Sequence, residues 1–142
     1  MSRNFGDFRY KESKTETEGA TFKDTAVSSE PDIIVHDVDN EEDEFIVIAT
    51  DGIWECADNQ AIIDFIRVRI AEWAPTPDLF RLVLESLFDR LCPAELDYGD
   101  RGGDNMSGYI MSPIANVERV KELCSRPTPD RRPDPERLFS RL

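Results

Sequence analysis

Two aspartates stand at the ends of apolar segments, and their type and position could support metal chemistry. Asp51 directly follows the run EFIVIAT (residues 44–50), and Asp104 shortly precedes MSGYIM (residues 106–111). Each run has the composition of a strand, with β-branched and aromatic side chains. If the two strands are antiparallel neighbours, the end of one lies beside the start of the other. Both carboxylates would then converge at one edge of the sheet.

Two such carboxylates would favour a hard divalent cation between them. Like charges at this separation repel and raise each other's pKa, and a cation removes that penalty. Oxygen ligands without a nearby histidine or cysteine favour Mg²⁺ or Mn²⁺ over zinc. Asp51-Gly52 and Asp104-Asn105 are also common turn sequences. Spacing alone therefore leaves both interpretations open, a metal site and a pair of ordinary turns.

The elements that must position these aspartates are expected to be strands. Residues 32–38 and 45–50 read as two strands joined by the charged turn DNEEDE, which predicts an antiparallel hairpin. The second strand is almost continuously apolar, so we expect it to be covered on both faces. A third strand is expected over residues 106–112.

Helical periodicity follows the tryptophan at position 54. Asp58 or Asn59 can cap a first helix that ends at Pro75. A second helix is expected to begin at Thr76 and to stop at Pro93.

The remainder of the chain is mostly polar. A short helix is expected over residues 115–124, and the Pro- and charge-rich tail that follows is expected to be disordered. Residues 11–30 and 94–104 read as loops.

Composition limits the possible functions. The 142 residues suffice for one domain, and 17 basic against 30 acidic side chains give a formal net charge of −13. This argues against binding to nucleic acid or to an anionic membrane surface. Cys56, Cys92 and Cys124 are spaced as free thiols rather than as a zinc site. With no membrane span or signal-peptide core in the sequence, a cytoplasmic or nuclear location is expected.

Four segments, taken together, resemble the type 2C (PPM) metal-dependent serine/threonine protein phosphatases. They are SRNFGDFRYK (residues 2–11), VSSEPDI (27–33), DEFIVIATDGIWE (43–55) and GGDNMS (102–107). They occur in the order of that family, and the resemblance extends over roughly residues 1–112.

The resemblance implies an α+β fold, an antiparallel β-sandwich flanked by helices, of which this chain would be the C-terminal portion. It implies hydrolysis of phosphoserine and phosphothreonine by a water activated at a binuclear Mg²⁺ or Mn²⁺ centre. Asp51 and Asp104 match metal ligands of the family. Gly52, Asn105 and Asp7 match positions expected to support the site, with no further catalytic residue assigned.

The chain also departs from the family pattern. It contains no D-G-H-G-G motif, and His36, its only histidine, lies in a different context. We therefore expect residues 1–114 to be the C-terminal part of a phosphatase domain and residues 115–142 a short helix with a tail. Weak metal binding and little activity are expected of the chain alone.

The expected partners are a phosphoprotein substrate and either the absent N-terminal half or another protein that covers an exposed sheet face. The alternative function is that of a catalytically inactive pseudophosphatase or interaction fragment.

Overall fold

The computed structural model describes residues 3–11, 27–92 and 102–127. The chain divides into two compact units, Met1–Asp37 and Val38–Leu142. Parts of the predicted loops at 11–30 and 94–104, and the tail beyond position 127, lie outside the described residues. The expected boundary between a phosphatase part (residues 1–114) and a helix with a tail (residues 115–142) stays a prediction.

The smaller unit is held together by its N-terminal segment. Arg3 forms an isolated parallel bridge with Ser28, and its guanidinium donates to Glu30 O at 2.8 Å and to Asp32 Oδ1 at 3.0 Å. The helix α1 (Phe8–Lys11) follows a positive φ of 51° at Asp7. This unit exposes the large apolar side chains of Phe5, Phe8, Tyr10, Ile33, Ile34 and Val35.

The predicted strand over residues 32–38, and with it the predicted hairpin, is wrong for this structure. The segment forms no strand among the described residues, and Ile34 is 91% exposed. β-branched residues favour an extended backbone, but a strand also needs a partner, which only the surrounding fold supplies. The charged turn after it is present, since Asp43 N donates to Asp39 O at 2.7 Å.

The larger unit contains a two-stranded antiparallel sheet. β1 (Ile46–Ala49) pairs with β2 (Gly108–Met111), and Ala49 lies opposite Gly108. The strands predicted over 45–50 and 106–112 are thus confirmed with shorter bounds.

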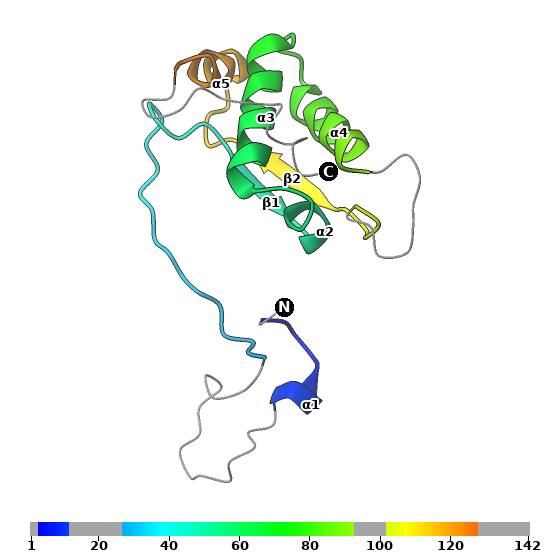
Figure 1. Ribbon diagram of the computed structural model, residues 1–142. Coiled ribbons are helices and arrows are strands. Elements are labelled where there is room, and N and C mark those ends of the chain that lie inside the picture. The colour runs from blue at the N-terminus through cyan, green and yellow to red at the C-terminus, as the bar shows by residue number, and fades with distance from the viewer. Residues whose placement is uncertain (1–2, 12–26, 93–101, 128–142) are drawn as a thin grey trace. The chain divides into compact units, whose positions relative to one another are not determined.

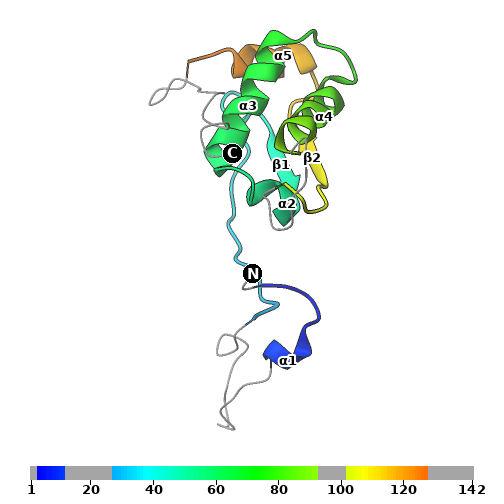
Figure 2. The ribbon, with the colours of Figure 1, turned by 45° about the vertical axis from the view of Figure 1, so that its right-hand side comes forward.

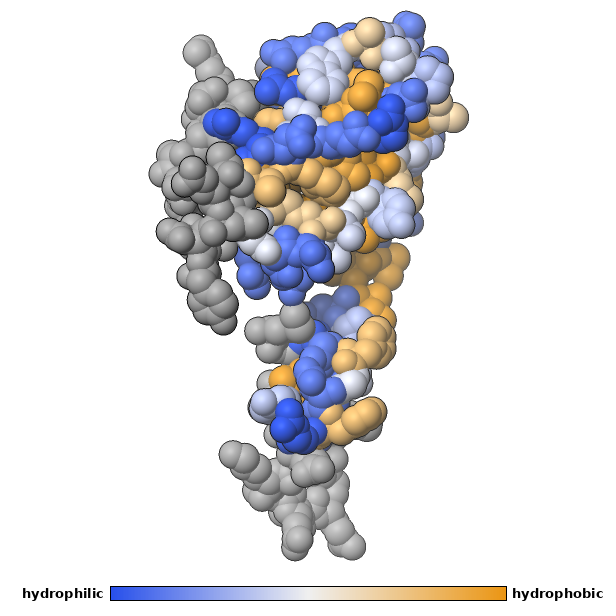
Figure 3. Space-filling model, turned by 90° about the vertical axis from the view of Figure 1, so that its right-hand side faces the viewer, coloured by the Kyte–Doolittle hydropathy of each residue, from blue (hydrophilic) through white to orange (hydrophobic). Residues whose placement is uncertain are grey.

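Burial alternates along both strands of this sheet. One face packs on the core, and the other exposes Ile46, Ile48, Tyr109 and Met111. The predicted coverage of both faces is therefore not found among the described residues. Figure 3 shows hydrophobic residues at the surface beside a band of hydrophilic ones.

Four helices lie in the described part of this unit. They are α2 (Asp51–Trp54), α3 (Asn59–Glu72), α4 (Leu79–Leu91) and α5 (Val117–Cys124). Asp58 caps α3 as predicted, because its carboxylate accepts from Gln60 N at 3.0 Å. The second predicted helix begins three residues later than expected, with Pro77 in the turn that precedes it.

Helices α3 and α4 pack together and cover the inner face of the sheet, while α5 lies against α3 (Figures 1 and 2). Their apolar stripes meet in one core, which agrees with the predicted α+β class. The buried core comprises Ile53, Cys56, Ala61, Ile62, Phe65, Ile66, Ile70, Leu79, Val83, Leu87, Leu91, Val120 and Cys124.

A largely buried ion pair joins the start of β1 to α3 and α5. The Arg67 guanidinium donates to both Glu44 carboxylate oxygens at 2.6 Å. It also donates to the backbone carbonyls of Leu123 at 3.3 Å and Arg126 at 3.2 Å. Ser112 Oγ, beyond the end of β2, donates to Glu44 O at 2.8 Å. The Arg67 side chain therefore connects α3, to which it belongs, with the segment before β1 and with the C-terminal end of α5.

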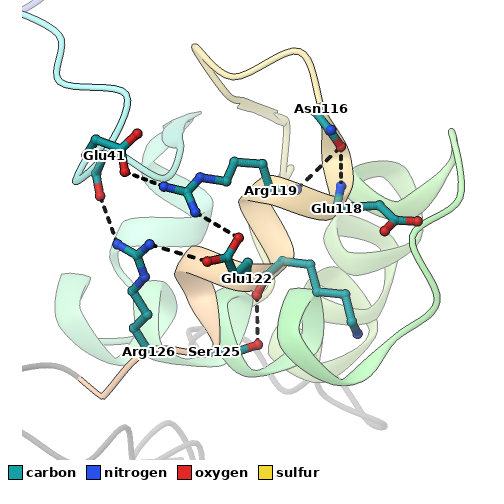
Figure 4. A network of polar contacts seen from close by, with 8 residues as sticks. Glu41, Asn116, Glu118, Arg119, Glu122, Ser125 and Arg126 are labelled. Atoms are coloured by element: carbon teal, nitrogen blue, oxygen red, sulfur yellow. Dashed lines mark hydrogen bonds and ion pairs between the residues drawn. The ribbon is translucent and has the colours of Figure 1, made fainter.

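A second network lies on the surface of α5 (Figure 4). Arg119 bridges Glu41 and Glu122, and Arg126 donates to Glu41 O at 3.2 Å. Asn116 caps the helix by accepting from Glu118 N at 2.9 Å. These contacts hold the turn before β1 against α5.

Among the described residues, no helix is both long and apolar enough to cross a membrane. Cys56, Cys92 and Cys124, which all lie in described segments, form no disulfide. That these thiols are reduced stays a prediction.

Glu44→Gln is expected to lower the free energy of unfolding by about 3 kcal/mol, because the Arg67 charge would stay buried without its partner. The measurement is urea denaturation of the full chain. Glu85→Gln removes the exposed partner of Arg81 and is the matched control, expected to change stability little because water and salt screen that pair. Equal losses of unfolding free energy in the two variants would contradict a stabilising role of Glu44 as the partner of the buried Arg67 charge.

Burial, followed by the nearby Glu44 carboxylate, raises the pKa of Cys124 to about 12. The folded chain then keeps a thiol proton that the unfolded chain releases near its ordinary pKa of about 8.5. The protonated Cys124 thiol contributes its full stabilisation at any pH below the pKa of the unfolded chain. The free energy of unfolding should therefore fall as the pH rises from about 9 towards 12.

Urea denaturation at increasing pH should show a flatter decline for Cys124→Ala than for the unsubstituted chain. Cys92→Ser, at an exposed thiol, should follow the unsubstituted chain. The same slope in all three proteins would exclude Cys124 as the cause.

Candidate functional site

The two predicted aspartates lie at the same end of the sheet, Asp51 at the start of α2 and Asp104 in the loop before β2. Asp51 begins α2 two residues after β1 ends, and Asp104 precedes β2 by four residues. Because Ala49 pairs with Gly108, the end of β1 lies beside the beginning of β2 (Figure 1). The convergence expected from the sequence is therefore present in the backbone.

The start of α2 and the loop of Asp104 contact each other closely at Gly52. A Cβ atom built on Gly52 would lie 2.5 Å from Asn105 O and 3.5 Å from the Cβ of Asp104. Real Cβ atoms essentially never make a contact as short as the first distance, so a larger residue here would force the Asn105 backbone to shift. Because Gly52 has no side chain, the loop of Asp104 can lie directly against the backbone at Gly52, the residue after Asp51.

Hydrogen bonds fasten the same two segments. Thr50 N donates to Ser107 O at 2.9 Å, and Ser107 N donates to Thr50 Oγ1 at 3.1 Å. Within the second loop, Asn105 N donates to Asp104 Oδ1 at 2.7 Å. Asp51 is partly buried and Asp104 is exposed, so a cation could reach both carboxylates from solvent.

The supporting residues differ in what the structure says of them. The backbone carbonyl of Asn105 faces Gly52, and a role for its side-chain amide stays a prediction. Asp7 belongs to the smaller unit, where Asn4 donates to its carboxylate, and its support of the site also stays a prediction. Trp54 donates from Nε1 to Ala49 O at 3.0 Å and packs on the core, as expected of a structural residue.

Sequence reasoning did not single out Thr50 and Ser107. Both are small hydroxyl residues at strand ends, a pattern common enough to pass as ordinary turn chemistry. Their pairing across 57 residues becomes visible only once the strand register is known. Within the described parts of the chain, no group of three or more histidine, cysteine, aspartate or glutamate side chains could hold a metal ion.

Comparison with known proteins identifies the family. The model of the protein phosphatase 2C family matches residues 1–91, more than half of the chain. The chain belongs to the protein phosphatase 2C family. The resemblance inferred from the motifs is thereby confirmed at the level of the family. The match ends before the GGDNMS segment, and the role of Asp104 as a metal ligand stays a prediction.

Curated relatives agree with this assignment. Protein phosphatase 2C homolog 2 of Aspergillus flavus is 35% identical over 124 residues, which cover 87% of this chain and 26% of the relative. The protein of the same name from Hypocrea jecorina is 37% identical over 78% of this chain and 23% of the relative.

Protein phosphatase 2C homolog 3 of Schizosaccharomyces pombe is 33% identical over 89% of this chain and 29% of the relative. The chain thus spans about a quarter of the length of these phosphatase 2C relatives. No solved structure matches it significantly.

Gly52→Ala is expected to lower the free energy of unfolding by about 1–3 kcal/mol, because its methyl group would collide with the Asn105 backbone of this phosphatase 2C chain. Alanine is otherwise the better helix former, so a loss reports the collision. Gly108→Ala is the comparison variant, since its Cβ would meet its nearest atoms at 3.3 Å and should cost less. Thermal denaturation measures both, and equal stability of the two variants would refute the close approach at Gly52.

Proposed function

We propose that this chain is part of a metal-dependent protein serine/threonine phosphatase in which Asp51 and Asp104 bind Mg²⁺ or Mn²⁺. The observation that carries the proposal is the close packing of Gly52, in the first turn of α2, on the loop of Asp104 at one end of the sheet. Membership of the phosphatase 2C family supports the reaction, and the carboxylate donors suit a hard cation.

The donor set fits one cation whose remaining positions are filled by water. Mg²⁺ commonly keeps several waters and takes only one or two protein carboxylates. Such an ion supplies Lewis-acid stabilisation and an acidic bound water for phosphate-ester hydrolysis. In this chain Asp51 lies two residues after β1 and Asp104 four residues before β2. The hydrogen bonds between Thr50 and Ser107 limit movement of the backbone between them.

We further propose that the chain corresponds to the C-terminal part of a phosphatase catalytic domain. Its length is about a quarter of that of its relatives, and its described residues contain no third carboxylate beside the pair. Further ligands of a binuclear centre would then come from outside the described residues. A second sheet would cover the apolar face formed by Ile46, Ile48, Tyr109 and Met111 and complete a sandwich.

A noncatalytic interaction module is the second candidate. It is favoured by the same lack of a third potential ligand among the described residues. That module would use the exposed sheet face and would need no metal. The two candidates differ in whether Mn²⁺ binds at the strand ends.

Mn²⁺ titration of the full chain, followed by electron paramagnetic resonance of free Mn²⁺, separates them. Asp51→Asn and Asp104→Asn should each weaken Mn²⁺ binding about tenfold or more, since each removes one charged ligand. Asp58→Asn is the matched control: asparagine caps a helix about as well as aspartate, so binding should stay unchanged.

A phosphopeptide assay then tests the reaction. A fusion of this chain behind the N-terminal part of the Schizosaccharomyces pombe relative should release phosphate with Mn²⁺, and the Asp51→Asn fusion should not. Absence of Mn²⁺ binding in both the chain and the fusion would refute the phosphatase and favour the interaction module.

A further inference from the structure

The ladder between β1 and β2 ends in an unusual way at Thr50. The register places Thr50 opposite Ser107, one step beyond the pair of Ala49 and Gly108. A regular hydrogen-bonded pair in an antiparallel sheet exchanges two bonds between backbone groups. Here Thr50 N donates to Ser107 O at 2.9 Å, but Ser107 N donates to the side-chain oxygen of Thr50 at 3.1 Å.

The backbone carbonyl of Thr50 is used elsewhere. It accepts from Ile53 N at 3.1 Å and thereby closes the first turn of α2. The Thr50 side chain makes no capping bond to that helix. Its hydroxyl thus replaces its own carbonyl in the ladder, while the carbonyl is released to begin the helix that carries Asp51.

The same hydroxyl also reaches the loop of Asp104. Thr50 Oγ1 lies 3.4 Å from both Asn105 O and Ser107 O, either of which can accept its proton. The Asn105 carbonyl is also the group against which Gly52 packs. Thr50 and Gly52, the residues on either side of Asp51, therefore both contact the segment that follows Asp104.

We propose that Thr50 is a positioning residue whose hydroxyl sets the placement of Asp51 relative to Asp104. Because the hydroxyl accepts the ladder bond, the chain can enter α2 directly after β1, and the loop of residues 104–107 still remains hydrogen-bonded to Thr50. The significance of this placement for metal binding rests on the proposed function, whereas the placement itself does not.

The test uses the full chain and compares substitutions at Thr50 that differ in acceptor strength. Thr50→Val keeps the shape and removes the hydroxyl, Thr50→Ser keeps the hydroxyl, and Thr50→Cys offers a weak acceptor. Ser112→Ala is the matched control, because it removes a hydroxyl bond between the same two chain segments at the opposite end of the sheet. Two quantities are measured: hydrogen exchange of the Ser107 amide without metal, and the dissociation constant for Mn²⁺.

Loss of one hydrogen bond, about 1 kcal/mol, corresponds to a change of about fivefold. Thr50→Val should therefore speed exchange at Ser107 and weaken Mn²⁺ binding by about that factor. Thr50→Ser should keep both within about twofold of the unsubstituted chain, and Thr50→Cys should lie between. Ser112→Ala should leave both unchanged even where it lowers overall stability.

The proposal is overturned if Thr50→Val leaves the Ser107 exchange unchanged, or if Thr50→Ser behaves like valine. It is also overturned if Ser112→Ala weakens Mn²⁺ binding as much as Thr50→Val, since loss of stability would then be the cause. If Thr50→Val fails to fold, the comparison of Thr50→Cys with Thr50→Ser decides in the same way. If neither this chain nor its fusion binds Mn²⁺ but the exchange changes as expected, the placement by Thr50 stands and the proposed phosphatase function is rejected.

Discussion

The register between β1 and β2 is the constraint on which the candidate site depends. Side chains alternate between the two faces of a sheet, so a slip of one residue would turn Val47 and Ala49 away from the core. The same slip would separate Gly52 from Asn105 and break the bonds between Thr50 and Ser107. Core packing and the meeting of the two aspartate segments therefore select the same register.

Two different sets of side-chain hydrogen bonds hold the two ends of this small sheet. At one end the Thr50 hydroxyl extends the ladder beyond its last regular pair. At the other end, Glu44 accepts from Arg67 through its carboxylate and from Ser112 through its backbone carbonyl. Four paired residues per strand form a short ladder. Its stability comes largely from these terminal contacts and from the helices on one face.

Local sequence signals predicted much of the larger unit. Asp58 was recognisable as a cap, and the apolar periodicity after it predicted α3 and α4, because each signal depends on neighbours within one or two turns. The position of Asp51 and Asp104 at strand ends predicted their convergence. What remained hidden depended on distant residues. The exposed residues 33–35 have strand composition, but no strand partner for them lies in the described parts of the chain. The role of Thr50 requires knowledge of which residue lies across from it.

The long separation between the paired strands has a consequence for the order of folding. Thr50 and Ser107 are 57 residues apart in sequence, with α3 and α4 between them. Closing so large a loop costs conformational entropy, whereas each helix forms from local contacts. During synthesis on the ribosome the helical hairpin can therefore assemble first. The aspartates can meet only after the second strand has left the exit tunnel.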